Sequence, residues 1–125
     1  MKKLVRNLLM AASLALVALP AAAAPNAATQ HEISGLMQAL ETSGCRFQRN
    51  GTWYDAVAAR GHLQRKYDYL LKRDMVDSSE QFIDRAASRS SMSGKAYKVS
   101  CSGAQEQDAS AWFLQQLRRL RAPAG

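Results

Sequence analysis

Apolar side chains recur at helical spacing in four stretches of the chain. The first stretch has them at intervals of three and four residues, which marks one face of a helix: Ile33, Leu36, Met37 and Leu40. The preceding segment TQHE has the form of a capping box, with Thr29 as the cap and Glu32 three residues later. Gly44 is a residue type that commonly follows a helix end. We therefore predict a helix over residues 30–43.

Three more helices are predicted by the same periodicity. Asp55 can cap the second helix, over residues 56–72. Ser78 can cap a third, which ends near residue 89, and Asp108 can cap the last. The expected buried faces are formed by Ala56, Ala59, Leu63, Tyr67 and Leu70, then by Phe82, Ile83, Ala86 and Ala87, and finally by Trp112, Phe113, Leu117 and Leu120.

Two segments alternate apolar and polar residues, as half-buried strands do: residues 45–49 and residues 97–101. The pair Asn50-Gly51 follows the first segment and is typical of a two-residue hairpin turn. Residues 52–54 then either return as a second strand or run straight into the next helix. Residues 103–107 are expected to form a loop.

The beginning of the chain has the three-part form of a secretory signal peptide. Three basic residues precede an apolar run over residues 8–19, and small residues follow it. This run is shorter than the roughly 20 residues that span a bilayer, and no other stretch is long enough. We expect a leader over residues 1–23, with cleavage after Ala23 favoured over cleavage after Ala24. The remaining residues 24–125 are expected to form a single domain in the periplasm.

The net charge changes when the leader is removed. The chain of 125 residues has 17 basic and 10 acidic residues. Loss of Lys2, Lys3 and Arg6 leaves fourteen basic residues, so the net charge falls from +7 to +4. A protein that binds nucleic acid usually has a denser basic stripe with aromatic residues interleaved. We therefore expect no nucleic-acid partner.

The chain contains two cysteines, Cys45 and Cys101. An even number of cysteines in an exported protein predicts a disulfide. Antiparallel pairing of the two predicted strands that opposes these cysteines also opposes Phe47 to Val99, so that apolar side chains share one face. The expected fold is α+β. A small antiparallel sheet of two to three strands packs against about four helices, with one Cys45–Cys101 disulfide.

The serine-rich segment SRSSMSGKAYKV contains residues that could carry chemistry. A small serine hydrolase would use Ser91 or Ser93 as its nucleophile. Its base would be His62 or Lys95. The spacing S-x-x-K is absent, because a methionine lies three residues before Lys95, and a phosphate-binding loop is excluded because an alanine follows the Gly-Lys pair. The alternative is a polar turn, with Gly94 at a positive φ.

The predicted strand pairing also places Arg49 opposite Tyr97, close to the serine-rich segment. If the second helix packs beneath the sheet, His62 and Lys66 reach the same end and complete a polar, basic concavity. We interpret this concavity as a site for an anionic ligand or a peptide terminus. Its candidate residues are Arg49, His62, Lys66, Ser91, Ser93, Lys95 and Tyr97. The alternative is that Arg49 and Tyr97 only pair across strands. The sequence has no CxxC motif and only two histidines, so no metal or cofactor is expected.

Three segments carry a resemblance to a known family: FQRNG (47–51), AARGHLQRKY (58–67) and SSEQFIDRAASRSSMSGKAYKV (78–99). With the tryptophan-containing last helix, they resemble the YfeK-like family of small exported bacterial proteins, a domain-of-unknown-function family. The residues that fit its pattern are Phe47, Arg49, Asn50, Gly51, Ala59, His62, Leu63, Lys66, Glu80, Phe82, Ile83, Ser88, Ser90, Ser91, Ser93, Gly94 and Tyr97. Ala58 replaces an acidic residue of that pattern. The resemblance implies export and this fold, and it implies no reaction.

The expected function is that of a non-enzymatic binding or interaction module of the bacterial cell envelope. Its partner would be an anionic small ligand or an envelope protein. One alternative is the small serine hydrolase described above. Another is an inhibitor or assembly partner of a second envelope protein.

Overall fold

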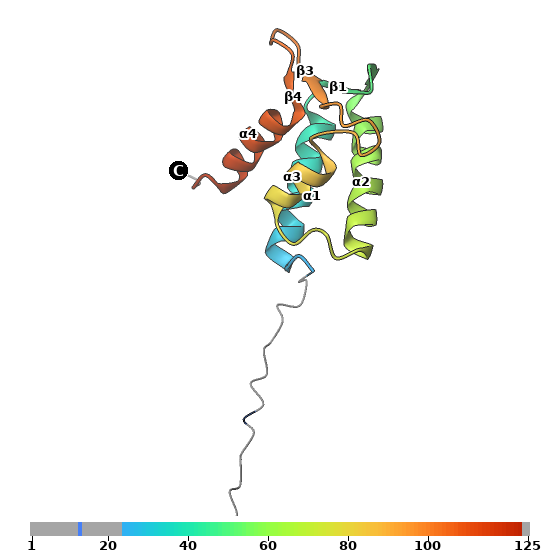
Figure 1. Ribbon diagram of the computed structural model, residues 1–125. Helices are drawn as coiled ribbons and strands as arrows, with labels where there is room; N and C mark the ends of the chain where they lie inside the picture. Colours follow the sequence, from blue (N-terminus) through green and yellow to red (C-terminus); the bar gives the residue numbers. More distant parts are fainter. Residues whose placement is uncertain (1–12, 14–23, 124–125) are drawn as a thin grey trace, which may run out of the picture.

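Four helices and a small sheet form the domain (Figure 1). The computed structural model describes residue 13 and residues 24–123, so all but one residue of the predicted leader lies outside the described residues. The elements are α1 (Ala27–Thr42), β1 (Arg46–Arg49), β2 (Thr52–Tyr54), α2 (Ala56–Lys72), α3 (Ser79–Ala86), β3 (Lys98–Ser100), β4 (Gln107–Asp108) and α4 (Ala109–Arg121). Helix α1 is central and contacts α2, α3 and α4, while the sheet lies at one end of the helices (Figure 1). The predicted α+β fold is confirmed.

The sheet has the strand order β2-β1-β3-β4 and is antiparallel throughout. Phe47 pairs with Val99, and the Cys45–Cys101 disulfide forms at the end of the same two strands, as predicted. The hairpin is confirmed too, with Asn50 and Gly51 at φ angles of 50° and 80°. The expectation of two to three strands was too low, because the chain returns after its loop and β4 pairs with β3.

With one exception, the residues of the helix faces predicted to be buried are buried, and all of these except Ala56 form one continuous core with the inner side of the sheet. Leu120 is the exception, since 48% of its surface is exposed. Its methyl groups lie beside Gly35 of α1. The prediction that Leu120 belongs to the buried face was therefore wrong.

Two predicted helix ends were also wrong. Helix α1 begins at Ala27, because the Asn26 side chain accepts a hydrogen bond of 2.8 Å from the Thr29 amide and so takes the role of cap. Helix α3 ends at Ala86, because the chain then leaves the helical path and Ser88 accepts a backbone hydrogen bond of 2.9 Å from Tyr97. The segment that follows α3 is thus hydrogen-bonded to the segment that leads into β3.

The caps of the other three helices are closer to the predicted ones. Asp55 caps α2 and Ser78 caps α3 through side-chain oxygens, as predicted. Asp108 precedes α4 but makes no side-chain capping bond, because its carboxylate pairs with the Lys98 ammonium on the neighbouring strand. No helix within residues 24–123 is both long enough and apolar enough to cross a membrane.

Candidate functional site

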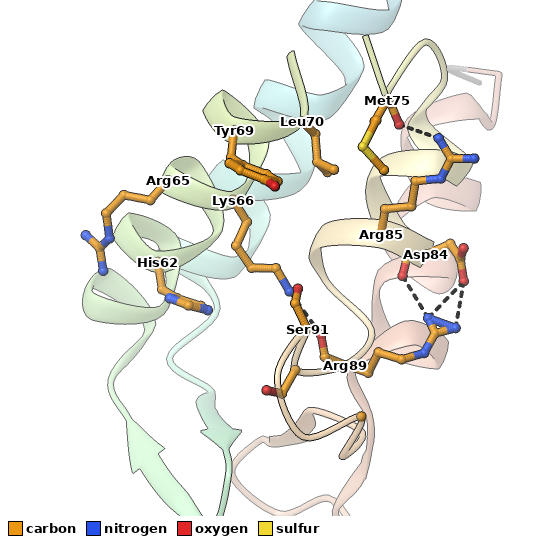
Figure 2. Close-up of a pocket in the computed structure, with 12 residues that line it drawn as sticks. His62, Arg65, Lys66, Tyr69, Leu70, Met75, Asp84, Arg85, Arg89 and Ser91 are labelled. Carbon is orange, nitrogen blue, oxygen red and sulfur yellow. Dashed lines mark hydrogen bonds and ion pairs between the residues drawn. The ribbon is translucent and has the colours of Figure 1, made fainter. Parts of the chain in front are cut away.

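A pocket of about 740 Å³ lies between α2 and α3, and the serine-rich turn closes one of its ends (Figure 2). The lining residues come from α2, from α3 and from the segments that precede and follow α3: His62, Arg65, Lys66, Tyr69, Leu70, Met75, Asp84, Arg85, Arg89, Ser90, Ser91 and Gly94. A volume of this size is within the range of small-molecule sites, about 300–1,000 Å³. We call this cavity the α2–α3 pocket.

Helix α2 builds one wall of the α2–α3 pocket by its periodicity. His62, Lys66 and Tyr69 are spaced by four and three residues, so they lie on one face of the helix. Leu63 and Tyr67, one position further along, are buried in the core. The same helix therefore anchors itself with one stripe of side chains and presents the neighbouring stripe to the pocket.

A hydrogen-bonded network connects this wall to the sheet and the serine-rich turn. The Lys66 ammonium donates to the Arg89 backbone carbonyl at 2.9 Å and to the Tyr97 hydroxyl at 3.0 Å. The Tyr97 hydroxyl also lies 3.3 Å from His62 Nε2, and the Arg49 guanidinium contacts His62 Nδ1. The same guanidinium nitrogen lies 2.5 Å from Nδ1 and 3.2 Å from Nε2, and because a guanidinium can only donate, the His62 ring is the acceptor in this contact.

Burial and like charges favour the neutral forms of the titratable groups in this network. Burial, followed by the positive charges of Arg49 and Lys66, lowers the pKa of His62 from 6.5 to about 4. Burial, followed by the charges of Arg49 and Arg89, lowers the pKa of Lys66 from 10.5 to about 8. Burial raises the pKa of Tyr97, so its hydroxyl keeps its proton at neutral pH. At pH 7 the histidine is therefore neutral, whereas most of the lysine is charged.

The lining of the α2–α3 pocket has an excess of positive charge. It contains Arg65, Lys66, Arg85 and Arg89, and the described lining includes one carboxylate, Asp84. That carboxylate is 3.0 Å from the Arg89 guanidinium, so it does not neutralise the lysine. Within residues 24–123, histidine, cysteine and carboxylate side chains form no group of three that could hold a metal ion. The excess of positive charge in the lining is suited to a ligand with negative charge.

The structure brings together most of the predicted site residues and separates two of them. Arg49, His62, Lys66 and Tyr97 form the network described above, and Arg49 reaches Tyr97 through His62 rather than by a direct hydrogen bond between their side chains. Ser91 lines the α2–α3 pocket (Figure 2). The expected concavity therefore has a counterpart in the structure, although its use as a binding site stays a prediction.

Ser93 and Lys95 lie outside the lining of this pocket. The Ser93 hydroxyl donates to Asn50 Oδ1 at 2.6 Å and accepts from the Lys95 amide at 3.2 Å, so it stabilises the turn against the hairpin. The Ser90 hydroxyl accepts from the Ser93 amide at 3.2 Å, which completes the turn. In the described part of the chain, neither Ser91 nor Ser93 forms a hydrogen bond with the side chain of His62 or of Lys95.

Several pocket residues were missed from the sequence. Arg65 and Tyr69 follow His62 at helical intervals, so extension of that spacing along α2 would have found them. Met75 precedes α3 and Arg89 follows it, so neither could be found from helical spacing. The tertiary fold brings both residues to the pocket. Helical periodicity thus predicts one wall, and tertiary packing supplies the other.

The network makes the fold sensitive to acid at His62. The stability that this group contributes is present above pH 6.5 and is lost as the pH falls toward 4, because the unfolded state binds the proton more tightly. We expect the wild type to lose about 1 kcal/mol more than His62→Gln between pH 7 and pH 5, after allowance for solvent screening. Urea unfolding of both proteins at each pH measures this difference. Equal losses in the two proteins would contradict the assignment.

The site lies within a segment that is related to known proteins. Residues 27–121 match the DUF5329 family of unknown function. The chain is also similar to the uncharacterized protein YfeK of Salmonella typhimurium, with 39% identity over 83 residues that cover 66% of this chain and 68% of YfeK. No solved structure matches the chain. The predicted resemblance is confirmed, and the chain belongs to the DUF5329 family of unknown function.

Proposed function

We propose that this protein is a non-enzymatic binding module of the bacterial envelope, and that its α2–α3 pocket takes a ligand with negative charge. The observation that carries the proposal is the environment of Lys66. Its hydrogen bonds go to two neutral oxygens, the Arg89 carbonyl and the Tyr97 hydroxyl. Among the side chains that the structure describes, no carboxylate pairs with its ammonium.

A half-buried lysine without a counter-charge is unfavourable for folding. Arg49 and Arg89 repel its charge, and burial removes part of its hydration. Perturbed groups of this kind gather at functional sites, where a ligand supplies the missing interaction. The ammonium has three N–H donors, of which the network uses two. The third donor can therefore bind an anionic oxygen in the pocket.

Binding is favoured over hydrolysis by the position of the serines. A serine nucleophile requires a base within hydrogen-bond distance. The Ser93 hydroxyl instead bonds to Asn50 and to the turn backbone, and Lys95 is exposed. The neutral His62 ring is held between Arg49 and Tyr97, which leaves it no serine partner within residues 24–123.

The proposed location in the periplasm is supported by two features. The first 23 residues have the form of a signal peptide, whose cleavage would release the domain outside the cytoplasm. The Cys45–Cys101 disulfide requires an oxidising compartment to persist. Anionic groups of the envelope are therefore the ligands to test first.

Thermal unfolding of the oxidised protein tests the proposal. The probes are dodecanoate, muramyl dipeptide, lipopolysaccharide and short acidic peptides. At a hundredfold excess over Kd, a ligand of the native state stabilises by about 2.7 kcal/mol. We expect at least one anion to do so, and we expect Lys66→Gln to lose the effect.

The matched control is Lys95→Gln, which removes an exposed lysine outside the pocket lining and should keep the full response. Both variants change the net charge equally, so the comparison separates pocket binding from general attraction of anions. Equal responses of the two variants would contradict the proposal. A flat response to all four probes, with the wild type folded, would contradict it as well.

A further inference from the structure

We propose that the ligand of the α2–α3 pocket is an amphiphile with an acidic head group and a single apolar chain. Its head group would lie at Lys66, and its chain would lie along Tyr69, Leu70 and Met75. This inference rests on the proposed function and specifies the chemical class of the ligand. Its support is the separation of polar and apolar side chains along the pocket.

The two ends of the pocket differ in chemistry (Figure 2). Tyr69 and Leu70 of α2 face Met75 across one end, while Lys66 points away from them toward Ser91 and the Arg89 carbonyl at the other end. An elongated ligand that is apolar at one end and anionic at the other matches both. A compact polar anion such as phosphate would leave the apolar end without a partner.

The apolar end is exposed to solvent although it is built from large apolar side chains. Tyr69 has 53% of its surface exposed and Met75 has 41%. Neighbouring exposed apolar residues that are rimmed by charged groups are typical of a binding surface. Arg65 and Arg85, which also line the pocket, supply such a rim here.

The backbone of the exposed methionine is held in place by two hydrogen bonds. The Met75 amide donates to the Leu70 carbonyl at 3.0 Å, and the Arg85 guanidinium donates to the Met75 carbonyl. These bonds fix the connection between α2 and α3, so the apolar wall exists before a ligand binds. The flexible thioether side chain of methionine can adapt to an apolar chain that packs against it.

Isothermal titration calorimetry with acetate, octanoate and dodecanoate tests the inference on the oxidised protein. These three carboxylates share a head group and differ only in chain length. Affinity should increase about fourfold for each methylene group that enters the pocket. Dodecyltrimethylammonium has the same chain with a cationic head group, and we expect it not to bind.

Variants at the apolar end complete the test. Tyr69→Ser combined with Met75→Gln should weaken dodecanoate binding at least tenfold, and the fold should survive because both side chains are exposed. Met92→Gln is the matched control. Met92 is 98% exposed and is not among the lining residues, so its replacement should leave the affinity unchanged.

The outcomes separate this inference from the proposed function. If an anion binds in a manner that depends on Lys66 but not on chain length, the amphiphile is wrong and the proposed function stands. An acidic peptide that binds more tightly than dodecanoate has the same consequence. If no anion binds, or if the cationic amphiphile binds equally well, both proposals are wrong.

The amphiphile could be free in solution or could be taken from a membrane. Phosphatidylcholine vesicles that contain lysophosphatidylglycerol, an acidic lipid with one acyl chain, distinguish these sources when they are removed by sedimentation after incubation. Lipid that remains with the soluble protein indicates extraction, whereas dodecanoate binding without such transfer indicates a free amphiphile; both results support the inference. Protein that sediments with the vesicles equally in wild type, Lys66→Gln and the apolar double variant would overturn it.

Discussion

Joint replacement of Cys45 and Cys101 by alanine is expected to lower the free energy of unfolding by about 4 kcal/mol. The disulfide joins residues 56 positions apart, so it restricts a long loop in the unfolded chain. This loop contains β1, β2, α2, α3 and β3, which is most of the domain. For a domain of this size, such a loss is a large part of the total stability. Urea unfolding of the oxidised wild type and of the double variant measures the difference.

The reduced wild type is the control for this experiment. It should unfold at nearly the same urea concentration as the double variant, since both lack the crosslink. The dependence of the free energy on urea should be steeper in both than in the oxidised protein, because their unfolded states are more expanded. A loss of less than about 1 kcal/mol would show that the crosslink adds little to the sheet and helix packing.

The disulfide also bears on the candidate site. It fixes the pairing of β1 with β3, and these strands position two residues of the network. Arg49 is the last residue of β1, and Tyr97 immediately precedes β3. A shift of one residue between the strands would turn their side chains to the opposite face of the sheet. The crosslink therefore protects the geometry that holds His62 between Arg49 and Tyr97.

The central part of the sheet could be predicted because independent patterns agreed. The cysteines gave one register, and the apolar residues Phe47 and Val99 gave the same one. Strand β4 could not be predicted, because its two residues are polar and show no alternation. Its pairing depends on the return of the chain after the loop, which is set by tertiary structure. Short edge strands of this kind leave little signal in a sequence.

Some residues of the candidate site could also be predicted from the sequence, and others could not. His62 and Lys66 share a helix face, and Arg49 follows from the strand register, so these residues could be gathered from the sequence. Lys95 could not be placed, because the turn before it directs Ser93 toward Asn50. The Arg89 carbonyl was also beyond prediction, since α3 ends three residues before it and the chain changes direction there. Local periodicity is therefore informative only while the helix continues.

The pH dependence of Lys66→Met provides a second large effect. Below pH 8 the wild-type ammonium is charged in a half-buried position, which costs folding free energy. Above pH 10.5 the amine is neutral in the folded and unfolded states, so this cost disappears. The stability of the wild type should therefore increase relative to that of Lys66→Met between pH 8 and pH 10.5. We expect a relative change of about 2 kcal/mol after allowance for solvent screening.

Urea unfolding across this pH range tests the prediction, with Lys95→Met as the control for an exposed lysine. The control should differ from the wild type by a constant amount, and a flat difference for Lys66→Met would contradict the depressed pKa. A bound anion favours the charged ammonium, so dodecanoate should bind less tightly as the pH increases through about 8. The charge that weakens the folded state would then be the one that the ligand requires. The lower stability and the higher affinity below about pH 8, relative to pH 10.5, should therefore both depend on Lys66.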